Sequence, residues 1–167
     1  MSVTVSVRSY THSVTYVTDN ILKSFKDIIR LSGLDPDRFV QQWDTLHNGI
    51  RTWIESQHLE RVVLEVFDPR SDALLGRWDV EITYGWSTDN GQFWVDTDAI
   101  KFAMQKAGVH PSTASYSVKV TRKTGFAAVA GWSSTTLRST SGLIEQRVGS
   151  TVEGSGLTGG FSYYRRV

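Results

Sequence analysis

A stripe of large apolar residues between positions 39 and 54 constrains the fold of this chain more than any other feature of its sequence. The stripe consists of Phe39, Trp43, Leu46, Ile50, Trp53 and Ile54. Its spacing of three and four residues places these side chains on one face of a helix. Asp35-Pro36 precedes the stripe and supplies a capping residue followed by proline at the first helical position. The sequence therefore predicts a helix over about residues 36–58 that packs its apolar face on another element.

Two further helices are predicted on either side of this one. Apolar residues recur at helical spacing over about residues 12–32, where they are Val14, Val17, Ile21, Phe25 and Ile28. Gly33 is expected to end that helix, because glycine adopts the left-handed backbone that follows many helices. A third helix is predicted over about residues 96–107, with Gly108 as its end.

Alternating apolar and polar residues predict the strands. Val3, Val5 and Val7 alternate with polar residues, and longer strands are expected over residues 59–67, 74–84 and 115–123. A polar loop at 68–72 joins the two central strands into a hairpin, and a turn is predicted at 87–91. The expected fold class is α+β, with a mainly antiparallel sheet backed by three helices.

Length and composition favour a single domain over residues 1–167. Forty per cent of the residues are hydrophobic, which is enough to form a core. There is no cysteine, and no apolar run approaches the length of a membrane span. The first residues do not resemble a secretory signal. We therefore expect a cytoplasmic protein without a membrane partner, disulfides or thiolate metal sites.

The charges are distributed unevenly along the chain. Residues 1–100 carry nine basic and 15 acidic side chains, whereas residues 101–167 carry nine basic and two acidic ones. The basic half also contains Tyr116, Phe126, Trp132, Phe161, Tyr163 and Tyr164. This combination has two interpretations: a nucleic-acid-binding surface, or a basic C-terminal segment that lies on the acidic body of the same chain.

No candidate catalytic, cofactor-binding or metal-binding motif is supported by the residues around it. Gly154–Gly159 matches G-x-G-x-x-G, but no helix or acidic residue follows, so these glycines are interpreted as a flexible loop. The four histidines form no short metal-binding pair. Asp79 and Glu81 share a strand face opposite apolar residues, and they are expected to point at water or at a helix cation. The residues therefore favour a binding module, with no enzymatic activity, cofactor or metal.

Some features of the sequence can be compared with known families. They are the order of the elements, the polar, aromatic-ended segment after the last strand, and residues 11–19, 29–36, 78–79, 84–87, 131–133 and 149–153. Together they resemble the bacterial HORMA proteins that are encoded beside cGAS/DncV-like nucleotidyltransferases in CBASS antiphage operons. The resemblance covers nearly the whole chain.

The resemblance implies a signalling adaptor. Such proteins bind a short closure-motif peptide as an added strand, and a C-terminal safety belt wraps over it. It implies a core of about residues 1–130, a belt of about 131–167 and a receiving edge at 116–123. The implied peptide-binding residues are Tyr116, Val118, Val120, Arg122, Trp132, Val152, Leu157, Phe161 and Tyr163.

The partners that the resemblance implies are three. The closure-motif peptide comes from a sibling HORMA protein or from the nucleotidyltransferase, and this chain is expected to receive it. The bound form activates the cGAS/DncV-like nucleotidyltransferase. An AAA+ ATPase remodeller reopens the domain by pulling on residues 2–8, with Val3, Val5 and Val7 as its handle.

Overall fold

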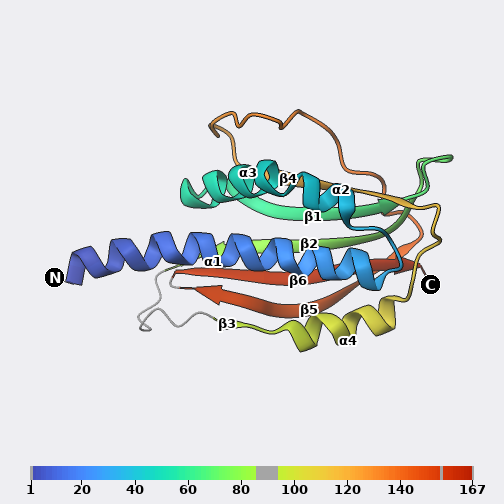
Figure 1. Cartoon of the computed structure of the whole chain (residues 1–167), viewed down its shortest axis with the longest axis horizontal. Helices are drawn as coiled ribbons and strands as arrows, with labels where there is room; N and C mark the ends of the chain where they lie inside the picture. Colours follow the sequence, from blue (N-terminus) through green and yellow to red (C-terminus); the bar gives the residue numbers. More distant parts are fainter. Residues whose placement is uncertain (1, 86–93, 155, 167) are drawn as a thin grey trace.

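Antiparallel strands form one sheet at the centre of the fold (Figure 1). The computed structural model describes residues 2–85, 94–154 and 156–166. In these residues the sheet has six strands in the order β3-β5-β6-β2-β1-β4. Their bounds are β1 (Leu59–Phe67), β2 (Leu74–Tyr84), β3 (Trp94–Val95), β4 (Ser115–Arg122), β5 (Leu143–Gly154) and β6 (Leu157–Arg166). The hairpin predicted from the central strands is confirmed, because β1 and β2 pair antiparallel.

The helices pack on one side of this sheet. Their bounds are α1 (Ser2–Leu31), α2 (Asp37–Gln41), α3 (Trp43–Glu55) and α4 (Thr97–Ala107). Figure 1 shows α1 lying along the sheet between α3 and α4. The predicted stripe of α1 is buried, and Phe25 meets Phe161 of β6 edge-to-face at 6.1 Å between ring centroids. The helix predicted over 36–58 is interrupted once, at Gln42, and so forms α2 and α3.

The strand predicted over residues 3–7 is wrong. These residues belong to α1, which runs without a break from Ser2 to Leu31. Three alternating pairs are too few to specify a strand, and β-branched residues lower helix propensity by only a few tenths of a kcal/mol each. Extending an existing helix requires no new nucleus, so the long helix that follows determines their conformation.

The Ser/Thr/Gly-rich C-terminal segment folds differently from the expectation. β5 and β6 pair with each other as a hairpin, and β6 also pairs with β2 inside the sheet. The hydrophobic core of the fold therefore includes residues of this hairpin, namely Val152, Leu157, Phe161 and Tyr163. The glycines at 154–159 are not a flexible loop: Gly156 has φ 79° in the hairpin turn. A Cβ atom at Gly159 would lie 2.7 Å from Val152 Cγ1, so close strand packing requires glycine there.

Two further features concern the whole chain. The turn predicted at 87–91 lies outside the described residues. Within the part of the chain that the structure describes, no helix has the length and apolar character of a membrane span, and no cluster of three or more His, Asp or Glu side chains could hold a metal ion.

Candidate functional site

The edge of the sheet at β4 is open. β4 pairs antiparallel with β1 on one side, and within the described ranges no strand lies on its other side. The β5–β6 hairpin occupies the opposite half of the sheet, against β2. An unpaired strand edge presents a row of main-chain donors and acceptors that can bind another extended chain.

The direction of these main-chain groups follows from the contacts at the two ends of β4. N–H and C=O groups point alternately to the two sides of a strand. The N–H of Lys123 donates to the carbonyl of His58 beside β1, at 2.8 Å, whereas Arg38 donates to the carbonyl of Tyr116. Odd positions of β4 therefore bond β1. The main-chain groups of Val118 and Val120 point to the open side.

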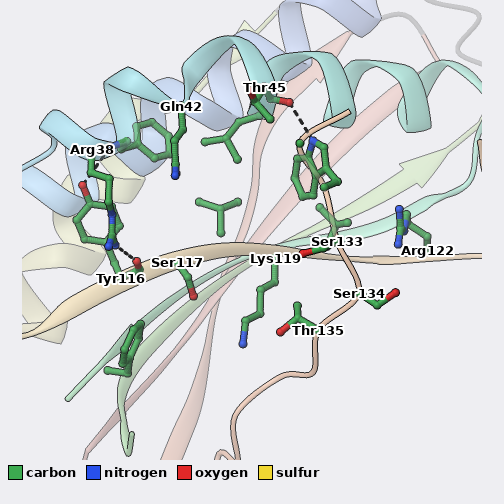
Figure 2. Close-up of a pocket in the computed structure, with 17 residues that line it drawn as sticks. Arg38, Gln42, Thr45, Tyr116, Ser117, Lys119, Arg122, Ser133, Ser134 and Thr135 are labelled. Carbon is green, nitrogen blue, oxygen red and sulfur yellow. Dashed lines mark hydrogen bonds between the residues drawn. The ribbon is translucent and has the colours of Figure 1, made fainter. Parts of the chain in front are cut away.

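A cavity of about 620 Å³ lies along this open edge (Figure 2). Helices α2 and α3 form one wall, β4 forms the floor, and an extended segment after β4 forms the other wall. The lining residues are Arg38, Phe39, Gln42, Thr45, Leu46, Phe67, Tyr116, Ser117, Val118, Lys119, Val120, Arg122, Gly131, Trp132, Ser133, Ser134 and Thr135.

We name the extended segment, residues 123–142, the crossing segment. It has no helix or strand, and it passes over α3 before it reaches β5 (Figure 1). Structureless connections of this length are uncommon in compact domains and usually carry function. Its position encloses the cavity without filling it.

The first half of the crossing segment is anchored to α3 by tryptophans. Trp132 Nε1 donates to the carbonyl of Thr45 at 2.9 Å, and its ring meets Trp53 edge-to-face at 5.0 Å between centroids. The Nε1 of Trp53 in turn donates to the carbonyl of Ala127 at 2.7 Å. Gly49 makes room for Trp132, because a Cβ atom there would overlap the indole ring.

The second half is anchored by a buried charge. The carboxylate of Glu65 on β1 has no exposed surface. Lys119 Nζ and Arg138 Nη1 each lie 2.6 Å from its Oε1, and the main-chain N–H of Arg138 donates to Oε2 at 2.7 Å. Arg138 also bonds Asp72 at 2.9 Å and lies 3.5 Å above the ring of Phe67. Lys119 Nζ further donates to the carbonyl of Thr136 at 2.5 Å. The ionic cluster of Glu65, Lys119 and Arg138 thus fixes the crossing segment to the sheet.

The structure brings together some of the residues predicted for the site and separates the others. Five of them line the cavity: Tyr116, Val118, Val120, Arg122 and Trp132. Four lie elsewhere, in the β5–β6 hairpin, where each is at most 2% exposed: Val152, Leu157, Phe161 and Tyr163. Tyr163, for example, stacks on Trp78 of β2 at 4.7 Å. These four are core residues, because their strands pair inside the sheet.

Several residues of the site escaped the sequence analysis. Arg38, Gln42 and Thr45 sit on the polar edge of an amphipathic helix and carry no distinguishing signal. Two other residues did carry a distinguishing signal. Gly49 interrupts a strong helical pattern, and such a glycine usually has a packing reason. Glu65 places a charge within the apolar run 62–66, so it needs a buried partner.

Asp79 is not directed at water or at a helix cation, contrary to expectation. It is buried on β2, and Arg77 binds both of its oxygens at 2.7 Å. The hydrogen bonds to Asp79 raise the pKa of Arg77 although burial opposes this. A carboxylate held on both oxygens by a strand neighbour is suited to structure and not to proton transfer. Glu81, on the same face, is exposed.

Several solved structures share the fold of this chain. The chain is similar to a component of the mitotic checkpoint complex, with a TM-score of 0.70 and 12% identity over 90% of this chain and 99% of the other. It is similar to C. elegans HTP-2 bound to the HIM-3 closure motif, with a TM-score of 0.66 and 11% identity over 86% and 85%.

A third similar structure comes from a bacterium. It is the E. coli MS115-1 CdnC:HORMA-deltaN complex, with a TM-score of 0.59 and 8% identity over 94% of this chain and 89% of the other. No curated protein matches the sequence. At these identities the structural similarities show the fold alone, and they confirm the α+β class.

The family follows from the sequence itself. The family model described as Bacterial HORMA domain 2 matches residues 2–167, which is nearly the entire chain. A match of this extent confirms the resemblance that the local sequence indicated, and it agrees with the architecture of an antiparallel sheet backed by helices. This chain belongs to the bacterial HORMA domain 2 family.

Proposed function

We propose that the chain is a peptide-binding adaptor that captures an extended closure-motif peptide as an added strand on β4. The observation that carries this proposal is the open edge of β4, whose outward main-chain groups line a cavity already roofed by the crossing segment. A peptide strand placed there bonds Val118 and Val120 through its main chain, and its side chains meet the walls. HTP-2 with its bound closure motif offers a precedent in the same fold.

The safety belt of this proposal is the crossing segment together with the β5–β6 hairpin. The hairpin is a fixed part of the sheet, whereas the crossing segment is held by side-chain contacts at two places. A segment held in this way can detach and return without unfolding the sheet. Peptide entry therefore requires the anchors at Trp132 and Arg138 to release and then to re-form over the bound strand.

The peptide-bound form is proposed to dock on a cGAS/DncV-like nucleotidyltransferase and to switch on cyclic-oligonucleotide synthesis in cytoplasmic antiphage defence. The CdnC:HORMA-deltaN complex supports this pairing of protein classes. The gene neighbourhood tests it: a nucleotidyltransferase gene should adjoin this one. Its purified product should make cyclic oligonucleotides only when this protein and a captured peptide are both present. Synthesis at the same rate without the protein would contradict the adaptor role.

Replacing Val118 by proline should weaken peptide capture by about tenfold or more without unfolding the protein. Val118→Pro removes an N–H that points to the open side, and proline is tolerated on such an edge. The peptide loses its hydrogen bond to that N–H, and the adjacent main-chain bonds lose their alignment. Together these losses correspond to binding that is weaker by about tenfold or more. Binding is measured by fluorescence polarisation, with peptides selected from a phage-displayed library of random linear sequences.

The matched control is Thr121→Pro in the same strand. The N–H of Thr121 points to β1, opposite Arg61, so its removal should lower the melting temperature sharply. Val118→Ala, which keeps the N–H, should bind nearly as well as the wild type. Equal binding by Val118→Pro and Val118→Ala would show that the peptide does not pair with β4.

An AAA+ ATPase is proposed to reopen the domain from its N-terminal end. Residues 2–8, which include Val3, Val5 and Val7, form the first turns of α1. Their deletion should leave peptide capture unchanged and block ATP-dependent release of the peptide by the remodeller. Release is followed as the decay of polarisation after ATP addition. Wild-type release from the deletion variant would place the handle elsewhere.

A further inference from the structure

The cavity on β4 has a charge that the proposed function does not explain. Its lining includes Arg38, Lys119 and Arg122, and none of its lining residues is acidic. A peptide that fills the cavity displaces water from these cations. Whether each cation needs a new partner depends on the bonds that it already makes.

Two of the three cations are already engaged within the protein. Lys119 lies 2.6 Å from the Glu65 carboxylate. Arg38 bonds the carbonyl of Tyr116 and the hydroxyl of Ser115, and its guanidinium stacks on the Tyr116 ring at 4.7 Å. Neither side chain has to change partners when the cavity is filled.

Arg122 is different. Among the described residues it forms no ion pair and no hydrogen bond through its side chain. Its guanidinium packs against two aromatic rings, 3.6 Å from the centroid of Phe126 and 4.3 Å from that of Trp53, and these rings are nearly perpendicular to each other. Desolvation by burial lowers the pKa of Arg122. The two rings therefore hold the guanidinium in place, and its N–H groups are left for a ligand.

We infer that the peptide captured on β4 carries a carboxylate side chain that pairs with Arg122. The inference rests on the proposed function and names the chemistry of its ligand. A planar guanidinium held in place by contacts with two rings is preorganised for two parallel N–H···O bonds to a carboxylate. Among the described residues, no side chain forms an ion pair or a hydrogen bond with Arg122.

The same geometry predicts where the acidic residue lies in the peptide. Along β4, every second residue points its side chain to the same face of the sheet. The side chains of Val118, Val120 and Arg122 therefore share one face. Residues directly opposite each other on paired strands also share a face. The acidic residue therefore lies two positions from an apolar residue that meets Val120 and the helix wall at Leu46.

The test begins with selection of peptides on wild-type protein and on Arg122→Met. Wild-type selection should enrich Asp or Glu two positions from an apolar residue, and selection on Arg122→Met should lose that enrichment while keeping the apolar one. Selected peptides are then synthesised with amidated C-termini, so that only a side-chain carboxylate can respond. Arg51→Met, which removes a cation of α3 outside the cavity lining, is the matched control.

A double-mutant cycle identifies the pair. Changing the peptide's acid to its amide should weaken binding to the wild type by about tenfold or more, and should change binding to Arg122→Met by less than about twofold. A peptide with lysine in place of the acid should bind Arg122→Glu better than it binds the wild type. Melting temperatures establish that each variant is folded.

Three results would overturn the inference. Peptides that depend on the β4 edge but show no acidic preference, or the same preference on Arg122→Met, would refute the carboxylate pairing and leave the proposed function standing. Failure to select any peptide that depends on Val118 would refute the proposed function itself. Displacement of bound peptide by single-stranded oligonucleotides, with a steep salt dependence, would assign the cations to phosphate.

Discussion

Replacing Arg138 by methionine is expected to lower the free energy of unfolding by about 2–4 kcal/mol and to detach the second half of the crossing segment. Glu65 would keep Lys119 as its one cation among the described residues, and water would reach its carboxylate where the segment detaches. Removing one partner from a buried ion pair costs about 3–5 kcal/mol, and the loss expected for Arg138→Met is smaller because Lys119 still neutralises the carboxylate. Urea denaturation measures the loss, and hydrogen exchange at residues 131–142 should rise.

An exposed ion pair supplies the control for Arg138→Met. Arg30 and Asp27 lie 3.2 Å apart on the surface of α1, with 63% of the arginine side chain exposed. Arg30→Met should change stability by less than about 1 kcal/mol. Combining Glu65→Gln with Arg138→Met removes the stranded charge and should recover part of the loss. Equal effects of Arg138→Met and Arg30→Met would mean that the ionic cluster does not hold the segment.

The ionic cluster also links the state of the crossing segment to the presence of a peptide. Lys119 contacts both Glu65 and the carbonyl of Thr136, so it lies where β4, β1 and the crossing segment meet. If the crossing segment departs, water enters and Glu65 becomes solvated, which reduces the cost of separating the charges. The closed arrangement is therefore stable without being irreversible, as a capture device requires.

The regular elements were predictable because their side chains repeat with the period of the backbone. The α3 stripe and the alternation in β1 and β2 extend over enough residues to distinguish a helix from a strand. The alternation in β4 predicted a strand with one polar face, and its edge position was implied only by the family resemblance. The strand prediction for residues 3–7 was wrong because three repeats of a two-residue pattern cannot outweigh the long helix that follows them.

The C-terminal hairpin was not predicted, and the reason is different. Its strands contain glycine where ordinary strands carry side chains, and this composition is typical of loops. Gly159 is required by the closeness of Val152, which belongs to the neighbouring strand. A contact between residues seven positions apart across a hairpin cannot be read from local periodicity. The resemblance placed the apolar residues of this segment in the safety belt, and the structure adds that they are buried in the core.

The anchors of the crossing segment depend on still longer-range contacts. Arg138 meets Glu65 across 73 positions of the chain, and Trp132 meets Thr45 across 87. Glu65 and Trp132 each carry a signal in the sequence, but only the fold identifies the partner of each. The floor of the cavity, which is a strand, was therefore predictable, whereas most residues of its walls were not.

Replacing Gly49 by alanine is expected to undock Trp132 and to weaken peptide capture by about tenfold or more. A Cβ atom at this position would lie 2.8 Å from Cζ2 of the indole, so the ring has to leave α3. The displaced ring gives up its hydrogen bond to Thr45 and its contact with Trp53. These losses, about 1–3 kcal/mol together, exceed the gain of up to about 1 kcal/mol from replacing glycine in a helix.

The effect of Gly49→Ala on the free energy of unfolding should change sign when Trp132 is absent. In a Trp132→Ala background the three atoms nearest to the new methyl group are gone, and alanine should stabilise α3 by about 0.5–1 kcal/mol. Urea denaturation of the four proteins in this cycle measures both signs, and fluorescence polarisation with selected peptides measures capture. Destabilisation in both backgrounds would mean that Gly49 serves α3 itself. Inversion would show that this glycine is kept free of a side chain so that the crossing segment can dock on the helix.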